Sequence, residues 1–179
     1  QTAIFLRADV AQAGDVERLV SETVAQFGRV DCAHNNAGIL GGIARLAEVS
    51  EDEYDRLMGV NLKGVWLCLR AEILQMQRQG GGAIVNTASI AGIRGSAWLP
   101  IYSTTKHGVV GLTRAAALGY AEDGIRVNAV CPGYVDTQMV TNTPLLQQRA
   151  AERTPMGRLA TPEEIAAAVV WLCSDAASY

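Results

Sequence analysis

The chain is poor in the features that mark membrane proteins and nucleic-acid binders. Its apolar runs fall well short of the ~20 residues that a bilayer-spanning helix needs, and no secretory signal peptide is visible at its start. Only 18% of its residues are charged, and the formal net charge is −3. Anionic nucleic acids and membranes would not attract such a chain. We therefore expect a soluble, cytoplasmic protein without a nucleic-acid or membrane partner.

Paired cysteines and closely spaced metal ligands are also missing. No cysteine belongs to a C-x-x-C pair, and the two histidines lack metal-ligand spacing. Cysteines in apolar runs are expected to be buried free thiols in a reducing cytosol. The residues concerned are Cys32, Cys68, Cys131, Cys173, His34 and His107. The sequence thus predicts neither a disulfide framework nor a metal site.

The chain does contain an alternation of apolar strand-like runs with helical segments. Its 179 residues, 49% of them hydrophobic, are enough for one domain with a single core. Strands are predicted at 2–6, 30–34, 83–87 and 126–131, and helices at 15–27, 51–79, 101–122 and 162–174. Continuous apolar strands between helices are typical of a parallel sheet covered on both faces. The predicted fold class is therefore α/β, a doubly wound, Rossmann-like sheet in one domain over 1–179.

Local signals set several of these boundaries. Gly28 closes the first helix, and Ser50-Glu51-Asp52-Glu53 and Thr161-Pro162-Glu163-Glu164 both have the form of a capping box. A break in the second helix is expected at 59–61. The stretch 137–158 is polar and contains prolines, which predicts a mobile flap.

One group of residues has the spacing of a catalytic site. Tyr102 and Lys106 are four apart in a predicted helix, so that their side chains share one face. Ser89 lies thirteen residues before Tyr102, just past the strand at 83–87, and ligands bind at the carboxyl ends of such strands. Asn61 is a polar residue in an apolar stretch at the expected helix break.

These residues, taken together, resemble the classical short-chain dehydrogenase/reductase family. The likeness extends over essentially all of the chain, and the motifs follow one another in the family's order. They are Asp9-Val10, Asn35-Asn36-Ala37-Gly38, Asn61, Ser89, the Tyr-x-x-x-Lys at 102–106, and Pro132-Gly133 with Thr137.

The resemblance implies hydride transfer between NAD or NADP and a secondary alcohol or ketone, for example a cyclic or hydroxylated one. Tyr102 would be the general acid/base, Ser89 would hydrogen-bond the substrate oxygen, and Lys106 would bind the nicotinamide ribose. Asn61 would organise the helix break and a water that leads protons out past Lys106.

Lys106 would also tune the phenol. An ordinary tyrosine has a pKa of about 10, so neutral-pH chemistry requires a decrease of about three units, or ~4 kcal/mol. A positive charge about 5 Å away supplies roughly 3 kcal/mol at an effective dielectric constant of about 20. We therefore expect Lys106 to lower the pKa of Tyr102.

The family's cofactor contacts can be placed in the same way. Asp9 and Val10 would face the adenine, and Asn36, Ala37 and Gly38 would line the adenosine ribose. The nicotinamide would be held by residues that follow the last predicted strand: Pro132, Gly133, Val135 and Thr137.

The sequence departs from the family in one respect. The glycine-rich dinucleotide fingerprint is absent, because the glycines at 38–42 and 80–82 lie in other contexts. In the family's strand order 3-2-1-4-5-6, Gln1 falls at the third strand, and Tyr179 precedes the final one. We therefore expect a fragment of a longer enzyme, truncated at both ends, in which NAD and NADP preference cannot be distinguished.

Other functions remain open. A β-ketoacyl carrier-protein reductase needs a basic surface for its acidic carrier, and Arg94, Arg149, Arg153 and Arg158 are candidates for it, although a solvated, ion-paired face is an alternative interpretation. A non-catalytic assembly or binding module would explain the missing glycine loop.

The same family resemblance also implies a homo-oligomer, a dimer or homotetramer built through the helices at 51–79 and 101–122. Trp66, Leu67 and Leu69 are compatible with such an interface or with simple core burial. Substrate choice is expected to depend on residues 90–100 and 134–158.

Overall fold

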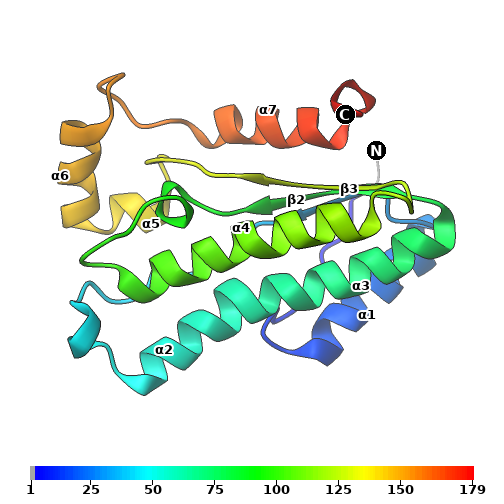
Figure 1. Ribbon diagram of the computed structural model, residues 1–179, viewed down its shortest axis with the longest axis horizontal. Helices are drawn as coiled ribbons and strands as arrows, with labels where there is room; N and C mark the ends of the chain where they lie inside the picture. Colours follow the sequence, from blue (N-terminus) through cyan, green and yellow to red (C-terminus); the bar gives the residue numbers. More distant parts are fainter. Residues whose placement is uncertain (1–2) are drawn as a thin grey trace.

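The centre of the molecule is a three-stranded parallel sheet. The computed structural model describes residues 3–179, with strands β1 (Cys32–Asn35), β2 (Gly82–Thr87) and β3 (Ile125–Val130) in the order β1-β2-β3 (Figure 1). Ala33 is in register with Ile84, and Ile84 with Val127. The parallel sheet predicted from the apolar runs is confirmed.

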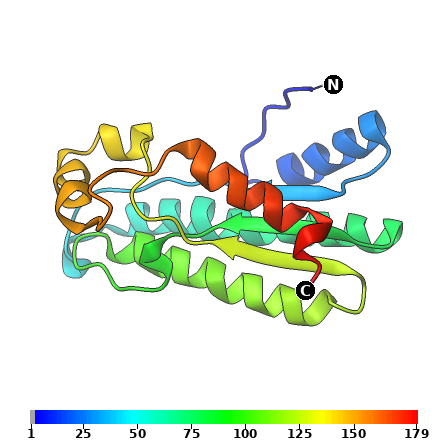
Figure 2. The same cartoon turned by 90° about the horizontal axis from the view of Figure 1, so that it is seen from above.

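Helices cover the sheet on both faces. On one face lie α3 (Gly64–Gln79) and α4 (Pro100–Tyr120), and on the other lies α7 (Pro162–Cys173), while α1 (Ala13–Phe27) packs beside α3 (Figures 1 and 2). This layering is the doubly wound, Rossmann-like α/β arrangement that the sequence predicts. Among the described residues, no helix is both long enough and apolar enough to cross a bilayer.

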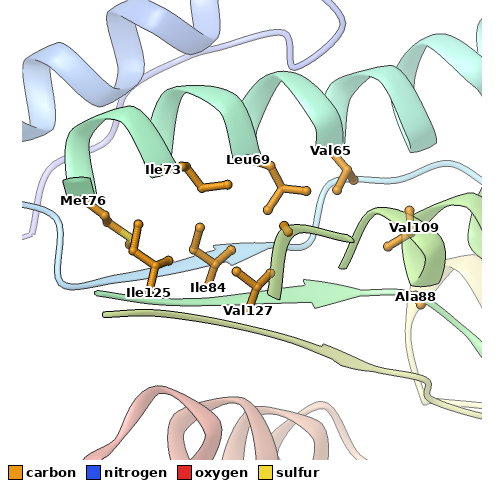
Figure 3. Close-up of a cluster of buried hydrophobic side chains, with 10 residues drawn as sticks. Val65, Leu69, Ile73, Met76, Ile84, Ala88, Val109, Ile125 and Val127 are labelled. Atoms are coloured by element: carbon orange, nitrogen blue, oxygen red, sulfur yellow. The ribbon is translucent and has the colours of Figure 1, made fainter. Parts of the chain in front are cut away.

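The core lies between α3 and the sheet. Four side chains on the inner face of α3 point down onto β2 and β3, and each of these four is almost completely buried (Figure 3). A fully buried side chain of this size stabilises the fold by roughly 1.5–3 kcal/mol. The contacting residues are Val65, Leu69, Ile73 and Met76 from the helix, and Ile84, Ile125 and Val127 from the strands.

The predicted helix ends are only partly as expected. The αL residue Gly28 closes α1, and Thr161 with Glu164 forms the full capping box of α7. At α2 (Glu51–Met58), the Ser50 hydroxyl accepts from the Glu53 amide, but the Glu53 carboxylate does not return the bond. It accepts from the Gly42 amide at 2.7 Å instead, because this loop passes over the start of the helix.

The expected helix break is a π-helical turn, Gly59–Lys63, between α2 and α3. The segment predicted as a polar flap contains two helices, α5 (Gln138–Thr141) and α6 (Pro144–Arg153). Pro144 is the first residue of α6, where a missing N–H is harmless, so it begins this helix and does not interrupt it.

Two sequence predictions are wrong. No strand forms at Ala3–Leu6, and Thr2 lies outside the described residues. This segment leaves the body of the molecule (Figure 2) and pairs with none of the three strands, and an extended chain without a ladder partner is not a strand. Of the cysteines expected to be buried, Cys68 is, but Cys32 on the edge strand β1 is exposed.

A buried polar network crosses the sheet from α3 to α4. The Asn35 amide nitrogen donates to Glu72 Oε2 at 3.0 Å and to Asn86 Oδ1 at 2.9 Å, and Asn86 donates onward to Thr113 at 2.9 Å. Only 7% of the Glu72 surface is exposed. Burial raises the pKa of this carboxyl to about 7, against a hydrogen bond from Asn35 that lowers it.

We therefore predict that Glu72→Gln stabilises the protein at alkaline pH. Between pH 4.5 and about 7 the native state keeps a proton that the unfolded state releases, so wild-type stability falls as pH rises through this window. The glutamine keeps the acceptor for Asn35 without charge. Urea unfolding should show E72Q equal to wild type near pH 4.5 and more stable by roughly 2–3 kcal/mol at pH 8.

The exposed Glu122 provides a matched control, because E122Q removes the same charge from the surface. It should change stability by less than about 0.5 kcal/mol at either pH. If the free energies of unfolding of E72Q and wild type changed with pH in parallel, an ionised Glu72 would not destabilise the native state.

Candidate functional site

Of the predicted site residues, Ser89, Tyr102 and Lys106 lie together where β2 ends. Ser89 follows β2 and begins a 3₁₀ turn at Ile90–Gly92, and its Oγ accepts from the Ala91 amide at 3.1 Å. The turn lies against α4, where a Cβ on Gly92 would come within 2.7 Å of the Lys106 carbonyl oxygen. Ser89 thus caps a turn at the carboxyl edge of the sheet, where ligands of parallel α/β sheets bind.

Tyr102 and Lys106 lie in the first turns of α4, one turn apart on its inner face. Tyr102 is 9% exposed and Lys106 only 3%. The Lys106 Nζ lies 5.8 Å from the centre of the Tyr102 ring and donates to the Thr87 carbonyl at 2.7 Å. The ammonium is therefore held between the proton-bearing phenol and the end of β2.

Ser103 secures this arrangement and is a residue that sequence reasoning missed. Its hydroxyl is within hydrogen-bond distance of the Ala91 carbonyl at 2.8 Å and the Arg94 carbonyl at 3.1 Å. These contacts join the start of α4 to the loop after Ser89. The only sequence signal was a small hydroxyl residue beside Tyr102, which is common at a helix start.

Asn61 is completely buried in the π-helical turn. Its Oδ1 accepts from the Ile39 amide at 2.8 Å, and its Nδ2 donates to the Ile39 carbonyl at 2.8 Å and to the Thr105 hydroxyl at 3.3 Å. A Cβ on Gly38 would lie 3.4 Å from Asn61 Oδ1 and 3.5 Å from Lys106 Nζ. Asn61 thus clamps the turn after β1 against α4, close to the ammonium.

The pKa of Tyr102 is not lowered, contrary to the expectation from the nearby Lys106. Burial raises the pKa of the Tyr102 phenol, and the nearby Ser89 hydroxyl opposes this rise. Burial also lowers the pKa of Lys106 to about 8. The sequence argument assigned a full positive charge to Lys106 and omitted the desolvation of both groups, which disfavours each charged form.

A cavity of about 750 Å³ opens beside Ser89 and Tyr102. Its walls come from the loop before α4 and from the segment that contains α5 and α6. Both segments had been expected to determine substrate choice. Most wall residues are apolar, including Leu40, Trp98, Leu99, Met139, Val140 and Leu146. The four candidate arginines line it as well, and Arg158 forms an ion pair with Glu164 at 2.6 Å.

A second cavity, of about 280 Å³, lies along β1 and α3. Three of the predicted cofactor residues, Val10, Asn36 and Ala37, line it. Gly64, which sequence reasoning missed, also lines it and allows close approach, since a Cβ there would come within 2.9 Å of Val10 Cγ2. A glycine inside a helix was the available signal.

The remaining predicted cofactor residues are dispersed. Asp9 is exposed, and its Oδ1 accepts from the Ala11 amide at 3.0 Å, the local bond of a turn former. Gly133 lines the larger cavity, and the Pro132 carbonyl accepts from the Ile90 amide at 2.9 Å. Val135 bridges to Ala160, and Thr137 precedes α5 as its exposed N-cap residue.

Comparison with known proteins places this geometry in a family. A family model described as enoyl-(acyl carrier protein) reductase matches residues 1–179. The 2,5-dichloro-2,5-cyclohexadiene-1,4-diol dehydrogenase of Sphingobium indicum is 46% identical, over 99% of this chain and 73% of that protein. The cis-4-hydroxycyclohexanecarboxylate dehydrogenase of Sinomonas cyclohexanicum is 44% identical, over 99% and 72%.

Solved structures agree with the sequence matches. Levodione reductase superposes with a TM-score of 0.90 at 41% identity, over 96% of this chain and 70% of that one. The structure of ElxO with NADP bound superposes with a TM-score of 0.88 at 31% identity, over 98% of this chain and 73% of that one. For NAD⁺-bound xylitol dehydrogenase the TM-score is 0.87 at 33% identity, over 96% of this chain and 72% of that one. The fold, the sequence matches and the arrangement of Ser89, Tyr102 and Lys106 agree: this chain belongs to the short-chain dehydrogenase/reductase family.

Proposed function

We propose that the protein transfers a hydride between NAD(P) and a secondary alcohol or ketone, with Tyr102 as the general acid/base. The observation that carries the proposal is the buried Tyr102–Lys106 pair: the Lys106 Nζ lies 5.8 Å from the centre of the Tyr102 ring, and Tyr102 borders the 750 Å³ cavity together with Ser89. The names of two relatives, a cyclohexadienediol dehydrogenase and a hydroxycyclohexanecarboxylate dehydrogenase, support a cyclic alcohol as substrate.

Tyr102 takes the hydroxyl proton when an alcohol is oxidised and returns it when a ketone is reduced. Ser89 orients the substrate oxygen. The bond from the Ala91 amide uses only a lone pair of Oγ, so the Ser89 O–H, which lies near the Tyr102 phenol, can turn to donate to that oxygen. The substrate oxygen then lies between two hydroxyl groups at the carboxyl edge of the sheet.

Lys106 and Asn61 support this proton transfer. The Lys106 ammonium favours the phenolate, and its bond to the Thr87 carbonyl fixes its position. Asn61 is a positioning residue in the proposal. It holds Ile39, and with it the turn at Asn36–Gly38, close to Lys106.

The residues present fit the nicotinamide side of a dinucleotide. A Cβ on Gly38 would lie 3.5 Å from Lys106 Nζ, so the turn after β1 brings its backbone beside the ammonium that would bind the nicotinamide ribose. Asn36, Ala37 and Gly38 would line that side, and the loop after β3, with Pro132, Gly133, Val135 and Thr137, would hold the nicotinamide. Asp9 and Val10 would face the adenine. When bound, the cofactor accepts or supplies the hydride, and both NAD and NADP remain candidates.

Assembly as a homo-oligomer is part of the same proposal. Of the three apolar residues considered for an interface, Leu67 and Leu69 are buried within the chain, and only Trp66 on α3 is exposed. Trp66 is therefore the residue that supports a dimer or tetramer through this helix.

The first prediction concerns Tyr102. Replacing it by phenylalanine removes only the ionisable oxygen, so Y102F should lower kcat for alcohol oxidation by about 10²–10⁴-fold, the usual contribution of a general acid/base. Tyr120 provides the matched control, because it lies at the other end of the same helix and packs against the main hydrophobic core, away from Tyr102. Y120F should retain the wild-type rate. Equal rates for Y102F and wild type would overturn the assignment.

The second prediction concerns pH. Oxidation requires the phenolate, and burial holds the pKa of Tyr102 above its usual value, so the oxidation rate should rise from neutral to alkaline pH. Removing the Lys106 charge disfavours the phenolate further, so K106M should shift the profile to higher pH. The exposed Lys63 is the chain's only other lysine, and K63M should leave the profile in place. Coincident profiles for K106M and wild type would exclude an electrostatic role.

A further inference from the structure

The large cavity beside Tyr102 is positively charged, although the chain as a whole is negative. Four arginines and one glutamate line it, whereas the formal net charge of the chain is −3. The glutamate, Glu164, is already neutralised, because both of its carboxylate oxygens accept from Arg158 at 2.6 and 2.8 Å. Within residues 3–179, no carboxylate pairs with the other three arginines, Arg94, Arg149 and Arg153.

Two of these arginines lie on one face of α6. Arg149 and Arg153 are four residues apart, and Leu146, three residues before Arg149, packs in the same hydrophobic cluster as Tyr102. The face of α6 that turns toward the site therefore carries both guanidinium groups. Figure 1 shows α6 at the end of the molecule where α4 begins, and both arginines line the cavity that borders Tyr102.

The rest of the cavity wall is mostly apolar. Aliphatic and aromatic side chains such as Trp98, Leu99 and Val140 surround the space between the phenol and the arginines. A volume of about 750 Å³ lies within the range of roughly 300–1,000 Å³ that small-molecule sites have. Such a cavity suits a ligand with an apolar body, an oxygen at one end and an anionic group at the other.

We propose that the substrate carries a carboxylate and that Arg149 binds it, with Arg153 and Arg94 beside it. The guanidinium fork matches a carboxylate with two parallel hydrogen bonds. Arg149 is half-buried, whereas Arg94 and Arg153 are exposed and their interactions are weakened by water and salt. This inference rests on the proposed function, because it names the substrate class of the same site.

The test compares two ring alcohols that differ only in charge, cyclohexanol and 4-hydroxycyclohexanecarboxylate, on wild type and Arg149→Gln. Oxidation is followed with NAD and with NADP, and binding of the matching ketones is measured by calorimetry. Wild type should prefer the carboxylate. R149Q should raise KM and Kd for the carboxylate compounds about tenfold to a hundredfold, with kcat little changed, as expected for loss of a charge-assisted bond.

Controls separate this role from a general loss of charge or fold. The exposed Arg114 lies on α4 and does not line the cavity, so R114Q should match wild type with both alcohols. R149Q should handle cyclohexanol as wild type does. R149K should recover part of the carboxylate preference, because it restores the charge without the fork.

The outcomes distinguish this inference from the proposed function. Equal binding of the carboxylate by R149Q and wild type, or no preference for the carboxylate in wild type, overturns the carboxylate site while oxidation of cyclohexanol still supports the dehydrogenase. Arg149-dependent binding without turnover supports the site and contradicts the dehydrogenase. An R149Q defect confined to acetoacetyl thioesters of an acidic carrier protein would overturn the small-acid proposal in favour of carrier docking.

Discussion

The bond between the Lys106 ammonium and the Thr87 carbonyl is the contact on which the rest of the site depends. It places a buried cation at the end of β2, where water cannot solvate it, and joins α4 to the sheet at that point. Two turns approach the same lysine closely: the Gly38 turn comes near its ammonium, and the Gly92 turn packs on its backbone. A side chain at position 92 would come within 2.7 Å of the Lys106 carbonyl oxygen and would force the Ser89 loop away from α4.

Desolvation acts on both Tyr102 and Lys106, the pair proposed to transfer the proton. Burial raises the pKa of Tyr102 and lowers that of Lys106, so each group resists its charged form. A phenolate beside an ammonium is nevertheless a neutral pair, and the two charges compensate each other in a medium of low dielectric constant. Proton loss from Tyr102 is therefore tied to the charge of Lys106, which makes the pair a unit and not two independent residues.

Local and periodic signals predicted most of the fold and placed Ser89 and Tyr102 at the same edge of the sheet. Gly28 ends a helix because only glycine adopts its backbone conformation easily, and Thr161 with Glu164 caps a helix through bonds that span four residues. Such features are local, so a sequence can reveal them. The parallel sheet followed from continuous apolar runs, and the edge that gathers Ser89 and Tyr102 followed from the direction of the strands.

Features that depend on distant partners could not be predicted in this way. The Glu53 carboxylate accepts a hydrogen bond from the Gly42 amide of a loop and not from the first turn of its own helix. Asn35 donates hydrogen bonds to Glu72 and Asn86, which belong to two other elements. The run before Arg7 has strand-like composition, but a strand exists only beside a partner, and composition does not supply one. The pKa of Tyr102 was misjudged for the same reason, since burial is a property of the whole fold.

The cavity has two kinds of wall, and the Ser103 hydroxyl holds the first of them together. Through its contacts to the Ala91 and Arg94 carbonyls, the Ser89 loop and the start of α4 form one body that carries the reactive groups. The opposite wall, α5 and α6, meets that body mainly through Leu146 and Val140. Arg94 and Trp98 belong to the first wall and Arg149 to the second, so both walls contribute to the proposed recognition, whereas Ser89 and Tyr102 belong to the first alone. Substitutions in α5 and α6 can therefore change the range of molecules accepted while Ser89 and Tyr102 keep their positions.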